Sequence, residues 1–586
     1  MKTWSGLVLA GAAILLELLP VAVAHGNDGE AVDMDMSPAP SDAAPAPMAI
    51  PTSYFRHTEH GKMILAHIAL MSIGWAFVLP VAVMLSVAGS RFKLPAQLAF
   101  LLVNAFGLLT GVIYNHSTPN FFEGEKHSSV GWVITWIASA WVIMGLVTLH
   151  SPASNHKRRR SGQAVTAAAM AEYGRFEDTP ISDPRRWSGD SGQGSERNSS
   201  SLFSQSRSPS IQSENQQLHD PPRSYEHDDE DDEFDTHEKR SFLRRTTVDR
   251  FLSRNVGRLG GFRRTLLAIR IVHVLLEKSL LCLGFLGILT GAVIYSGIFH
   301  GDSVFNGLAH FIKGGIFFWY GLLTFGRWMG CFADFGWAWN KKPSKEVVGR
   351  WPAMMPSAEF IESAVICFYG ISNVGLEHLA ASGAEWAPID LEHVSITLMF
   401  FGGGLLGMLI ESTTIRDLLM STIQLARDDS NNMEEEFRQP TQWSFSMNPM
   451  PALTILLLGV MMGSHKQESM VSTMLHAQWG NLFGGFAIAR IATYGILYIR
   501  LPVSHLPQRP PTEIVSSFCL VAGGLLFMLS NKDTVAALEY NNLDAMFVFN
   551  VVVGFSAFLM AWATTCIAIK GWAQRRVHAR KLKSLA

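Results

Sequence analysis

Long runs of apolar residues, each near 20 residues in length, recur along this chain between polar segments. A helix of about 20 residues rises about 30 Å, which is the thickness of the hydrocarbon core of a bilayer. The pattern therefore predicts an all-α, polytopic membrane helix bundle of about eleven spans. The predicted spans are 63–88, 95–114, 129–149, 274–299, 304–325, 360–381, 391–410, 449–463, 470–497, 514–529 and 546–569.

The N-terminus has the pattern of a secretory signal. Lys2 precedes an apolar run, and Ala22-Val23-Ala24 supplies the small residues of a cleavage site. We interpret residues 1–24 as a signal peptide, with an uncleaved first anchor as the alternative. Residues 25–56 are then a disordered lumenal leader.

A long polar segment over residues 151–263 interrupts the apolar pattern. It is rich in Ser, Arg, Asp and Glu and cannot bury enough apolar surface to fold alone. We expect a disordered cytosolic loop between a three-span part, residues 57–150, and an eight-span part, residues 264–583. Ser208-Pro209 and Arg244-Arg245-Thr246 resemble kinase targets, so the loop is either a regulated segment or a plain solvated tether.

Positive charge gathers in alternate loops. Lys and Arg follow the first, third, fifth, seventh and ninth predicted spans and close the chain. Because such loops stay in the cytosol, the mature N-terminus is predicted to be lumenal and the C-terminus cytosolic. This topology predicts a multi-pass protein of the secretory pathway, in the plasma membrane, the vacuole or another endomembrane.

Composition supports a membrane protein and argues against several other classes. Of the 586 residues, 48% are hydrophobic and 16% charged, and the net charge is −2. The predicted partner is the lipid bilayer and not nucleic acid, and no phosphate-binding loop or nucleotide fold is recognisable. The five cysteines form no CxxC motif, so we expect neither a disulfide framework nor a zinc finger.

Histidines concentrate at the predicted lumenal ends of the first spans. His60 and His67 are seven residues apart on one predicted helix face, and His127 opens the third span at the depth of His67. Two imidazoles from facing helices are what bis-histidine haem ligation requires. At the cytosolic side His150 and His273 form a second candidate pair. The alternative is that these histidines cap helices or bind interfacial water.

Several motifs accompany these histidines. They are the His67…Gly74-Trp75…Pro80…Arg91 run, Gly107…Gly111 in the second span, His127…Gly131 in the third, and His273 at the start of the fourth. The region of about residues 57–300 thereby resembles the transmembrane cytochrome b-561 family. That resemblance implies haem b and electron transfer across a membrane through a four-helix core. The chain departs from the family in its second span, where Phe100 occupies the position expected for a histidine ligand.

The second half carries a denser acid–histidine cluster at its predicted lumenal helix ends. Its members are Glu377, His378, Asp390, His393, His465 and His476. Nitrogen and carboxylate ligands suit a divalent transition metal such as zinc or copper. The alternative is a polar rim of hydrogen-bonded pairs. At the other side, Glu359, Glu362 and Glu411 are either interfacial charges or part of an ion path.

The same half carries recognisable phrases. These are Leu376-Glu377-His378, Asp390-Leu391-Glu392-His393, Asn448-Pro449-Met450-Pro451, Gln478-Trp479-Gly480 and Arg509-Pro510-Pro511-Thr512-Glu513. They resemble the fungal Ytp-type family of multispanning integral membrane proteins, over nearly the whole chain. The resemblance implies the architecture, with an N-terminal domain like residues 50–150 joined to a multispan C-terminal domain.

Three functions compete at this point. The first is a haem-binding membrane protein that transfers electrons through lumenal histidines. The second is a metal-ion transporter or sensor that uses the acid–histidine cluster, and the third is a metal-dependent membrane hydrolase. Whether the protein is an enzyme is left open by the sequence.

The predicted topology can be tested by proteolysis. A protease added to sealed vesicles, with their cytosolic face outward, should cut the chain between Ser151 and Arg263. Cleavage only after the vesicles are permeabilised would reverse the predicted orientation.

Overall fold

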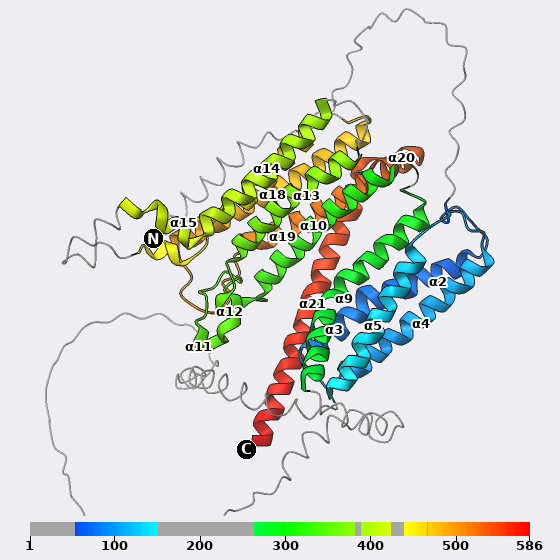
Figure 1. The fold of residues 1–586 in the computed structure, drawn as a ribbon. Helices are drawn as coiled ribbons and strands as arrows, with labels where there is room; N and C mark the ends of the chain where they lie inside the picture. The colour runs from blue at the N-terminus through cyan, green and yellow to red at the C-terminus, as the bar shows by residue number, and fades with distance from the viewer. Residues whose placement is uncertain are drawn as a thin grey trace, which may run out of the picture. The chain divides into compact units, whose positions relative to one another are not determined.

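The computed structural model describes residues 53–149, 263–299, 301, 303–380, 388–422, 439–465 and 467–585. Within these ranges the regular elements are helices, and no strand occurs (Figure 1). The predicted signal peptide, the leader up to residue 52 and residues 150–262 of the predicted loop lie outside the described residues.

Nine helices of the described chain are long and apolar enough to cross a membrane, which confirms a multispanning all-α fold. They cover Gly61–Val87, Lys93–Ser117, His127–Val147, Leu267–Ser296, Ser303–Met329, Val394–Glu411, Met470–Ile499, Thr512–Leu529 and Ala545–Lys583. The remaining two predicted positions also hold helices, α13 (Ala358–Ala380) and α17 (Met450–Ser464). At 15 residues, α17 rises only about 22 Å.

The N-terminal part and the segment after residue 263 form one four-helix bundle. Its elements are α2 (Gly61–Ser72), the π-helical η1 (Ile73–Val78), α3 (Leu79–Val87), α4 (Lys93–Ser117), α5 (His127–Leu149) and α9 (Arg263–Ser296). Trp75, Phe100 and Trp141 fill its core. A buried polar chain crosses the same layer, because Trp75 Nε1 donates to Asn104 Oδ1 at 2.9 Å and Asn104 Nδ2 to Thr135 Oγ1 at 3.3 Å.

A proline in the first span explains one contact between distant segments. An α-helical hydrogen bond to the carbonyl oxygen of Ala76 would come from residue 80, which is Pro80 and has no N–H. The indole Nε1 of Trp562, on α21 (Ala545–Leu585), donates to that oxygen at 2.9 Å instead. Helix α21 thereby joins the N-terminal bundle to the C-terminal helices, along which it also packs (Figure 1).

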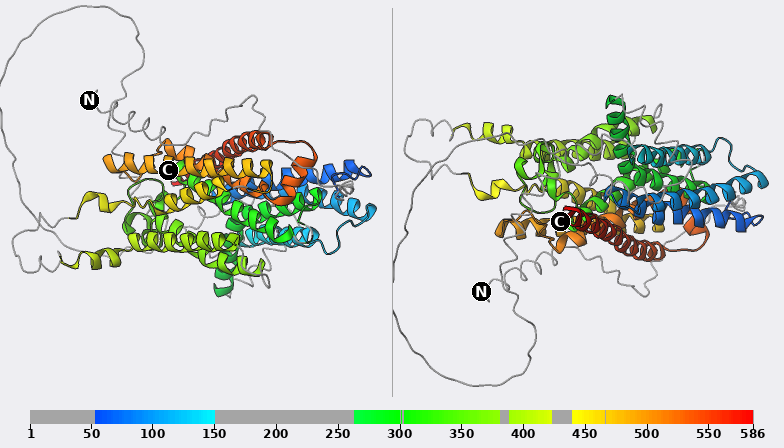
Figure 2. Two further views of the ribbon diagram at one scale, coloured as in Figure 1. Left: turned by 90° about the horizontal axis from the view of Figure 1, so that it is seen from above. Right: turned by 90° about the horizontal axis from the view of Figure 1, so that it is seen from below.

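The C-terminal part packs as pairs of helices in close contact. Besides α13, α17 and α21, its long elements are α10 (Ser303–Met329), α14 (Pro388–Glu411), α18 (Met470–Ile499) and α19 (Thr512–Leu529). Short helices connect them: η2 (Ala333–Phe335), α11 (Lys345–Val348), α12 (Arg350–Met354), α15 (Thr413–Leu419), η3 (Thr441–Ser444) and α20 (Lys532–Tyr540). Figure 2 shows this group and the N-terminal bundle from above and below.

Glycines permit the closest of these helix contacts. A Cβ atom at Gly314 on α10 would lie 2.5 Å from the carbonyl oxygen of Gly524 on α19. Gly459 on α17 and Gly480 on α18 face each other in the same way. Small residues of this kind let membrane helices approach backbone to backbone.

Two buried arginines and three glutamates tie α10, α13, α18 and α19 together. Arg327 donates to Glu362 Oε1 at 2.6 Å and to Glu359 Oε1 at 2.9 Å. Arg490 donates to Glu362 Oε2 at 3.2 Å, and its Nε lies 2.9 Å from Glu513 Oε1. All five side chains are at most 5% exposed, so these glutamates are not solvated interfacial charges.

Trp339 completes this cluster, which we call the arginine cluster. Its ring lies 4.2 Å from the Arg327 guanidinium and 5.1 Å from that of Arg490. Arg327 Nε also donates to the carbonyl oxygen of Trp337 at 2.7 Å, which anchors the segment after α10. Glu411 is held separately, at the end of α14, by the hydroxyls of Ser357 and Ser446 at 2.7 Å each.

Replacing Glu362 with Gln tests how much the fold depends on this cluster. The variant removes the carboxylate that both arginines share, and breaking a buried ion pair destabilises a protein by about 3–5 kcal/mol. We expect a clearly lower melting temperature in detergent, followed by tryptophan fluorescence. Glu346→Gln, on the exposed helix α11, is the control and should melt like the wild type. Equal melting of all three proteins would contradict the prediction.

Candidate functional site

His67 and His127 face each other near one end of the N-terminal bundle, as the sequence predicts. Their ring centres are 6.4 Å apart, and the ring planes are inclined at 83°. His67 lies on α2 and His127 is the first residue of α5. We call these residues the first histidine pair.

Hydrogen bonds at Nδ1 orient both imidazoles. His67 Nδ1 lies 2.8 Å from the carbonyl oxygen of Gly107, which can only accept, so Nδ1 carries the hydrogen. His127 Nδ1 lies 3.0 Å from Thr290 Oγ1, whose own hydrogen is donated to the carbonyl oxygen of Gly287. His127 Nδ1 is therefore also a donor. In both neutral rings Nε2 keeps the lone pair that can bind a metal ion.

A glycine on a neighbouring helix makes room for each ring. A Cβ atom at Gly111 on α4 would lie 2.6 Å from His67 Nδ1. A Cβ atom at Gly291 on α9 would lie 3.1 Å from Cε1 of His127. Any larger residue at these positions would displace the ring that lies against it. The structure thus supplies a reason for the Gly107…Gly111 spacing found in the sequence.

The other predicted residues of this half lie elsewhere. His60 is exposed and precedes α2 with a left-handed backbone (φ 56°), so the prediction that it shares a helix face with His67 is wrong. His150 lies outside the described residues. His273 is buried at the opposite end of the bundle and stacks on Trp141.

Phe100, which the sequence analysis placed at the family's ligand position, lies in the core of the bundle. It packs edge-on against Trp75 in the core, with ring centres 5.0 Å apart. The α4 side chain that lies near His273 is Gln97, because both side chains come within 3.9 Å of the Cβ position of Gly145.

The predicted acid–histidine cluster is described only in part. Glu377 and His378 lie in the last turn of α13 and Asp390 and His393 in the first turns of α14, but their side chains fall outside the described residues. His465 is 38% exposed and faces Glu392, with Nδ1 3.6 Å from the carboxylate oxygen Oε2. Among the side chains that the structure does describe, no three of His, Cys, Asp or Glu gather as a metal site.

His476 instead faces a residue that the sequence analysis missed. Its ring centre lies 6.1 Å from that of His310 on α10, with the planes inclined at 86°. Each Nδ1 lies 2.8 Å from a carbonyl oxygen of its own helix, that of Asn306 for His310 and that of Ser472 for His476. We call these residues the second histidine pair. The sequence could have indicated this pair through the equal depth of the two histidines in their spans, since each lies six or seven residues from the start of its helix.

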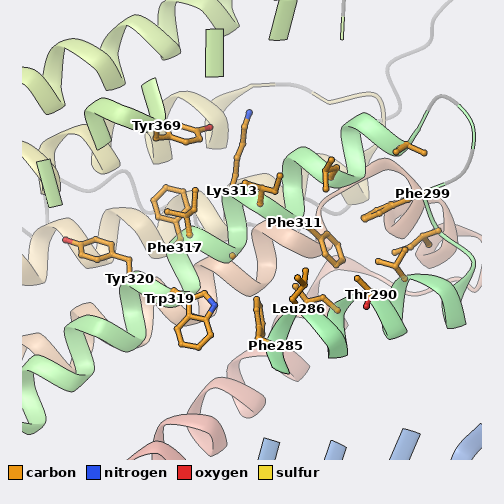
Figure 3. A pocket seen from close by; sticks show the side chains of 18 of the residues that line it. Phe285, Leu286, Thr290, Phe299, Phe311, Lys313, Phe317, Trp319, Tyr320 and Tyr369 are labelled. Carbon is orange, nitrogen blue, oxygen red and sulfur yellow. The ribbon is translucent and has the colours of Figure 1, made fainter. Parts of the chain in front are cut away.

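A cavity of about 1090 Å³ lies beside His127, between α9, α10 and α13. Phe285, Phe311, Phe317 and Trp319 give it an aromatic lining (Figure 3). Its lining includes His127 and Glu362. Because the lining is mostly apolar, the cavity suits a lipid chain or another hydrophobic molecule.

Comparison with known proteins covers most of the chain. The family model described as "Protein YTP1-like, C-terminal" matches residues 283–571, and a model described as a domain of unknown function (DUF2427) matches residues 48–150. No solved structure shows a match of comparable significance.

Three fungal proteins are similar in sequence. An "uncharacterized membrane protein" of Schizosaccharomyces pombe is 34% identical over 528 residues, which covers 89% of this chain and 96% of that relative. An "uncharacterized membrane protein" of Saccharomyces cerevisiae is 35% identical over 365 residues, or 60% of this chain and 57% of the relative. Protein YTP1 of Saccharomyces cerevisiae is 25% identical over 214 residues, covering 36% and 39% of the two chains.

Two glycine variants test the packing of the first histidine pair. Gly111→Ala should displace the His67 ring and break its hydrogen bond to Gly107, which we expect to destabilise the protein by about 1–3 kcal/mol. Gly131→Ala on α5 is the matched control, because nothing lies within 4 Å of its Cβ position. Thermal unfolding in detergent should separate the two, and a stable Gly111→Ala variant would refute the tight fit.

Proposed function

This chain belongs to the YTP1-like family of integral multi-pass membrane proteins, and from that premise we propose that its N-terminal bundle binds haem b between His67 and His127. The bound haem serves single-electron transfer within the membrane. The histidine end of the bundle, where His67 and His127 lie, is assigned to the lumen and the opposite end to the cytosol. This orientation rests on the Lys and Arg bias of the loops and on eleven crossings, with α13 and α17 included.

The observation that carries the proposal is the separation of the two imidazoles. Two ring nitrogens that each lie about 2 Å from one metal place the ring centres roughly 6 Å apart. The observed 6.4 Å agrees with this value. The two imidazoles, one from α2 and one from α5, would together hold the haem iron.

The surroundings of the two rings support a haem as the bound group. Gly107 and Thr290 act as positioning residues, because their oxygens hold Nδ1 of each ring and leave Nε2 for the iron. Gly111 and Gly291 remove side-chain bulk where the rings lie. The resemblance to the cytochrome b-561 family supports the same group, whose iron takes up and releases one electron when bound.

One haem, and not two, is proposed for this bundle. At the opposite end His273 is accompanied from α4 by Gln97, which offers an amide in place of an imidazole. The histidine end carries both ligands that a single haem requires. The protein would then exchange electrons with a partner close to that end.

A metal-ion function is the second candidate, and the second histidine pair favours it. The separation of 6.1 Å between His310 and His476 also suits two ligands of one ion, and His465 lies close to His476. Trp479 and Phe527 pack around this pair, which favours a small ion such as zinc or copper over a macrocycle. Transport, sensing or metal-dependent hydrolysis would then be assigned to the C-terminal helices.

An optical spectrum of the purified full-length protein tests the haem proposal. Protein expressed with ample haem should show b-type absorbance at about one haem per chain. His67→Ala and His127→Ala should each abolish it, because both imidazoles would be needed to hold the haem. His116→Ala, an exposed histidine on α4 near the same end of the bundle, is the matched control and should keep the full absorbance.

Two results would overturn the haem proposal. One is a wild-type protein without absorbance under these conditions, and the other is an equal loss in the His116→Ala control. Metal analysis of the same samples addresses the second candidate. Zinc or copper that disappears in His476→Ala, without any haem in the wild type, would favour the metal-ion function.

A further inference from the structure

Four buried polar side chains meet at the end of the N-terminal bundle opposite to the first histidine pair. His273 Nε2, Gln97 Nε2, Trp141 Nε1 and Glu277 Oε1 are among the buried side-chain atoms of the described chain that have no hydrogen-bond partner. The four side chains are 9%, 2%, 0% and 9% exposed, respectively. Native proteins pair almost all of their buried polar groups, so a gathering of four unpaired atoms indicates a bound species.

Three helices, α4, α5 and α9, contribute these side chains to the same end of the bundle. His273 and Glu277 are four residues apart on α9, so they share one face of that helix. The Trp141 ring on α5 stacks on His273 with ring centres 6.4 Å apart and planes inclined at 21°. Gln97 Nε2 on α4 and His273 Nε2 lie 3.9 Å and 3.2 Å from the Cβ position of Gly145.

Gly145 leaves the centre of this group open. A side chain there would occupy the space between the His273 ring and the Gln97 amide. Ser86, Lys93 and Lys278 lie around the carboxylate of Glu277, and Lys93 also faces His273. Among the residues that the structure describes, the charged groups next to the site are therefore one carboxylate and two lysines.

We propose that His273, Glu277 and Gln97 bind one first-row divalent metal ion of the zinc class. His273 Nε2 and Glu277 Oε1 are its nitrogen and carboxylate ligands, and ligands at positions i and i+4 of a helix can reach one ion. Gln97 supplies its amide oxygen after a rotation of the amide group that exchanges the positions of its oxygen and nitrogen. This exchange leaves the shape of the side chain unchanged. Trp141 Nε1 donates a hydrogen bond to a water molecule that completes the coordination.

The donor set distinguishes this site from a haem site. Over the described parts of α4, α5 and α9, His273 is the one imidazole at this end of the bundle. A carboxylate, an amide and one imidazole are ligands for a hard or borderline divalent ion. The proposal is independent of haem binding at His67 and His127, which lie at the other end of the bundle.

Metal analysis of the full-length protein tests the site. Protein purified after growth with ample zinc and iron is dialysed, and its bound metal is measured by mass spectrometry and by titration with Co²⁺ as a coloured probe. We expect the wild type to bind one ion at this site. His273→Ala and Glu277→Gln should lose that ion and should bind Co²⁺ with at least a tenfold weaker affinity than the wild type. His116→Ala is the control, because this exposed histidine of α4 lies at the other end of the bundle and its loss should leave this ion in place.

Three results would overturn the proposal. The first is an equal metal content and Co²⁺ affinity in the wild type, His273→Ala and Glu277→Gln. The second is a wild type that carries two haems per chain and loses one of them in His273→Ala, because the site would then hold haem. The third is a full metal content in Gly145→Leu, whose side chain should fill the space.

Glu277→Gln keeps the shape of the side chain, and size-exclusion chromatography checks that each variant is folded.

Discussion

Arg327 and Arg490 set the frame of the C-terminal helices, because a charge within a membrane protein is stable only beside its counter-charges. Glu362 accepts from both arginines, and Glu359 and Glu513 each face one of them. The cluster can form in one register only, since each guanidinium must meet a carboxylate on another helix. It therefore holds α10, α13, α18 and α19 at a fixed depth relative to one another.

The second histidine pair depends on that frame. Arg327 and His310 are both on α10, and Arg490 and His476 are both on α18. On each helix the arginine and the histidine are separated by about 20–25 Å. An ion network at one end of the two helices thus determines which imidazoles meet at the other end. The glycine contacts between neighbouring helices keep this alignment close.

In the N-terminal bundle the buried polar groups must also be paired, and there the paired groups are neutral. Its first span contains Pro80, and the carbonyl that this proline leaves without an α-helical donor is satisfied by Trp562 from α21. Asn104 connects the indole of Trp75 to the hydroxyl of Thr135 across three helices. These bonds orient the faces of α2, α4 and α5. Where the bundle leaves polar atoms unpaired, around His273, the same rule points to a ligand.

The two histidine pairs share one design but differ in their surroundings. In all four rings Nδ1 is engaged by a carbonyl or hydroxyl oxygen, and the ring centres of each pair are just over 6 Å apart. Glycines adjoin the rings of the first pair, whereas Trp479 and Phe527 adjoin the second. The proposals of haem for the first pair and of a small ion for the second rest on this difference in the space beside the rings.

The sequence by itself determined the all-helical, multispanning architecture, the family and the facing of His67 and His127. Helix length fixes the depth of a residue along a span, so two histidines at equal depth on parallel spans could be paired without a structure. Only the tertiary structure decided that His310 faces His476, that Gln97 and not Phe100 lies near His273, and that Arg327 and Arg490 share Glu362. These contacts depend on which face of each helix meets which neighbour. The sequence of a helix that is apolar on all sides does not indicate which face contacts another helix, because lipid and protein neighbours accept the same side chains.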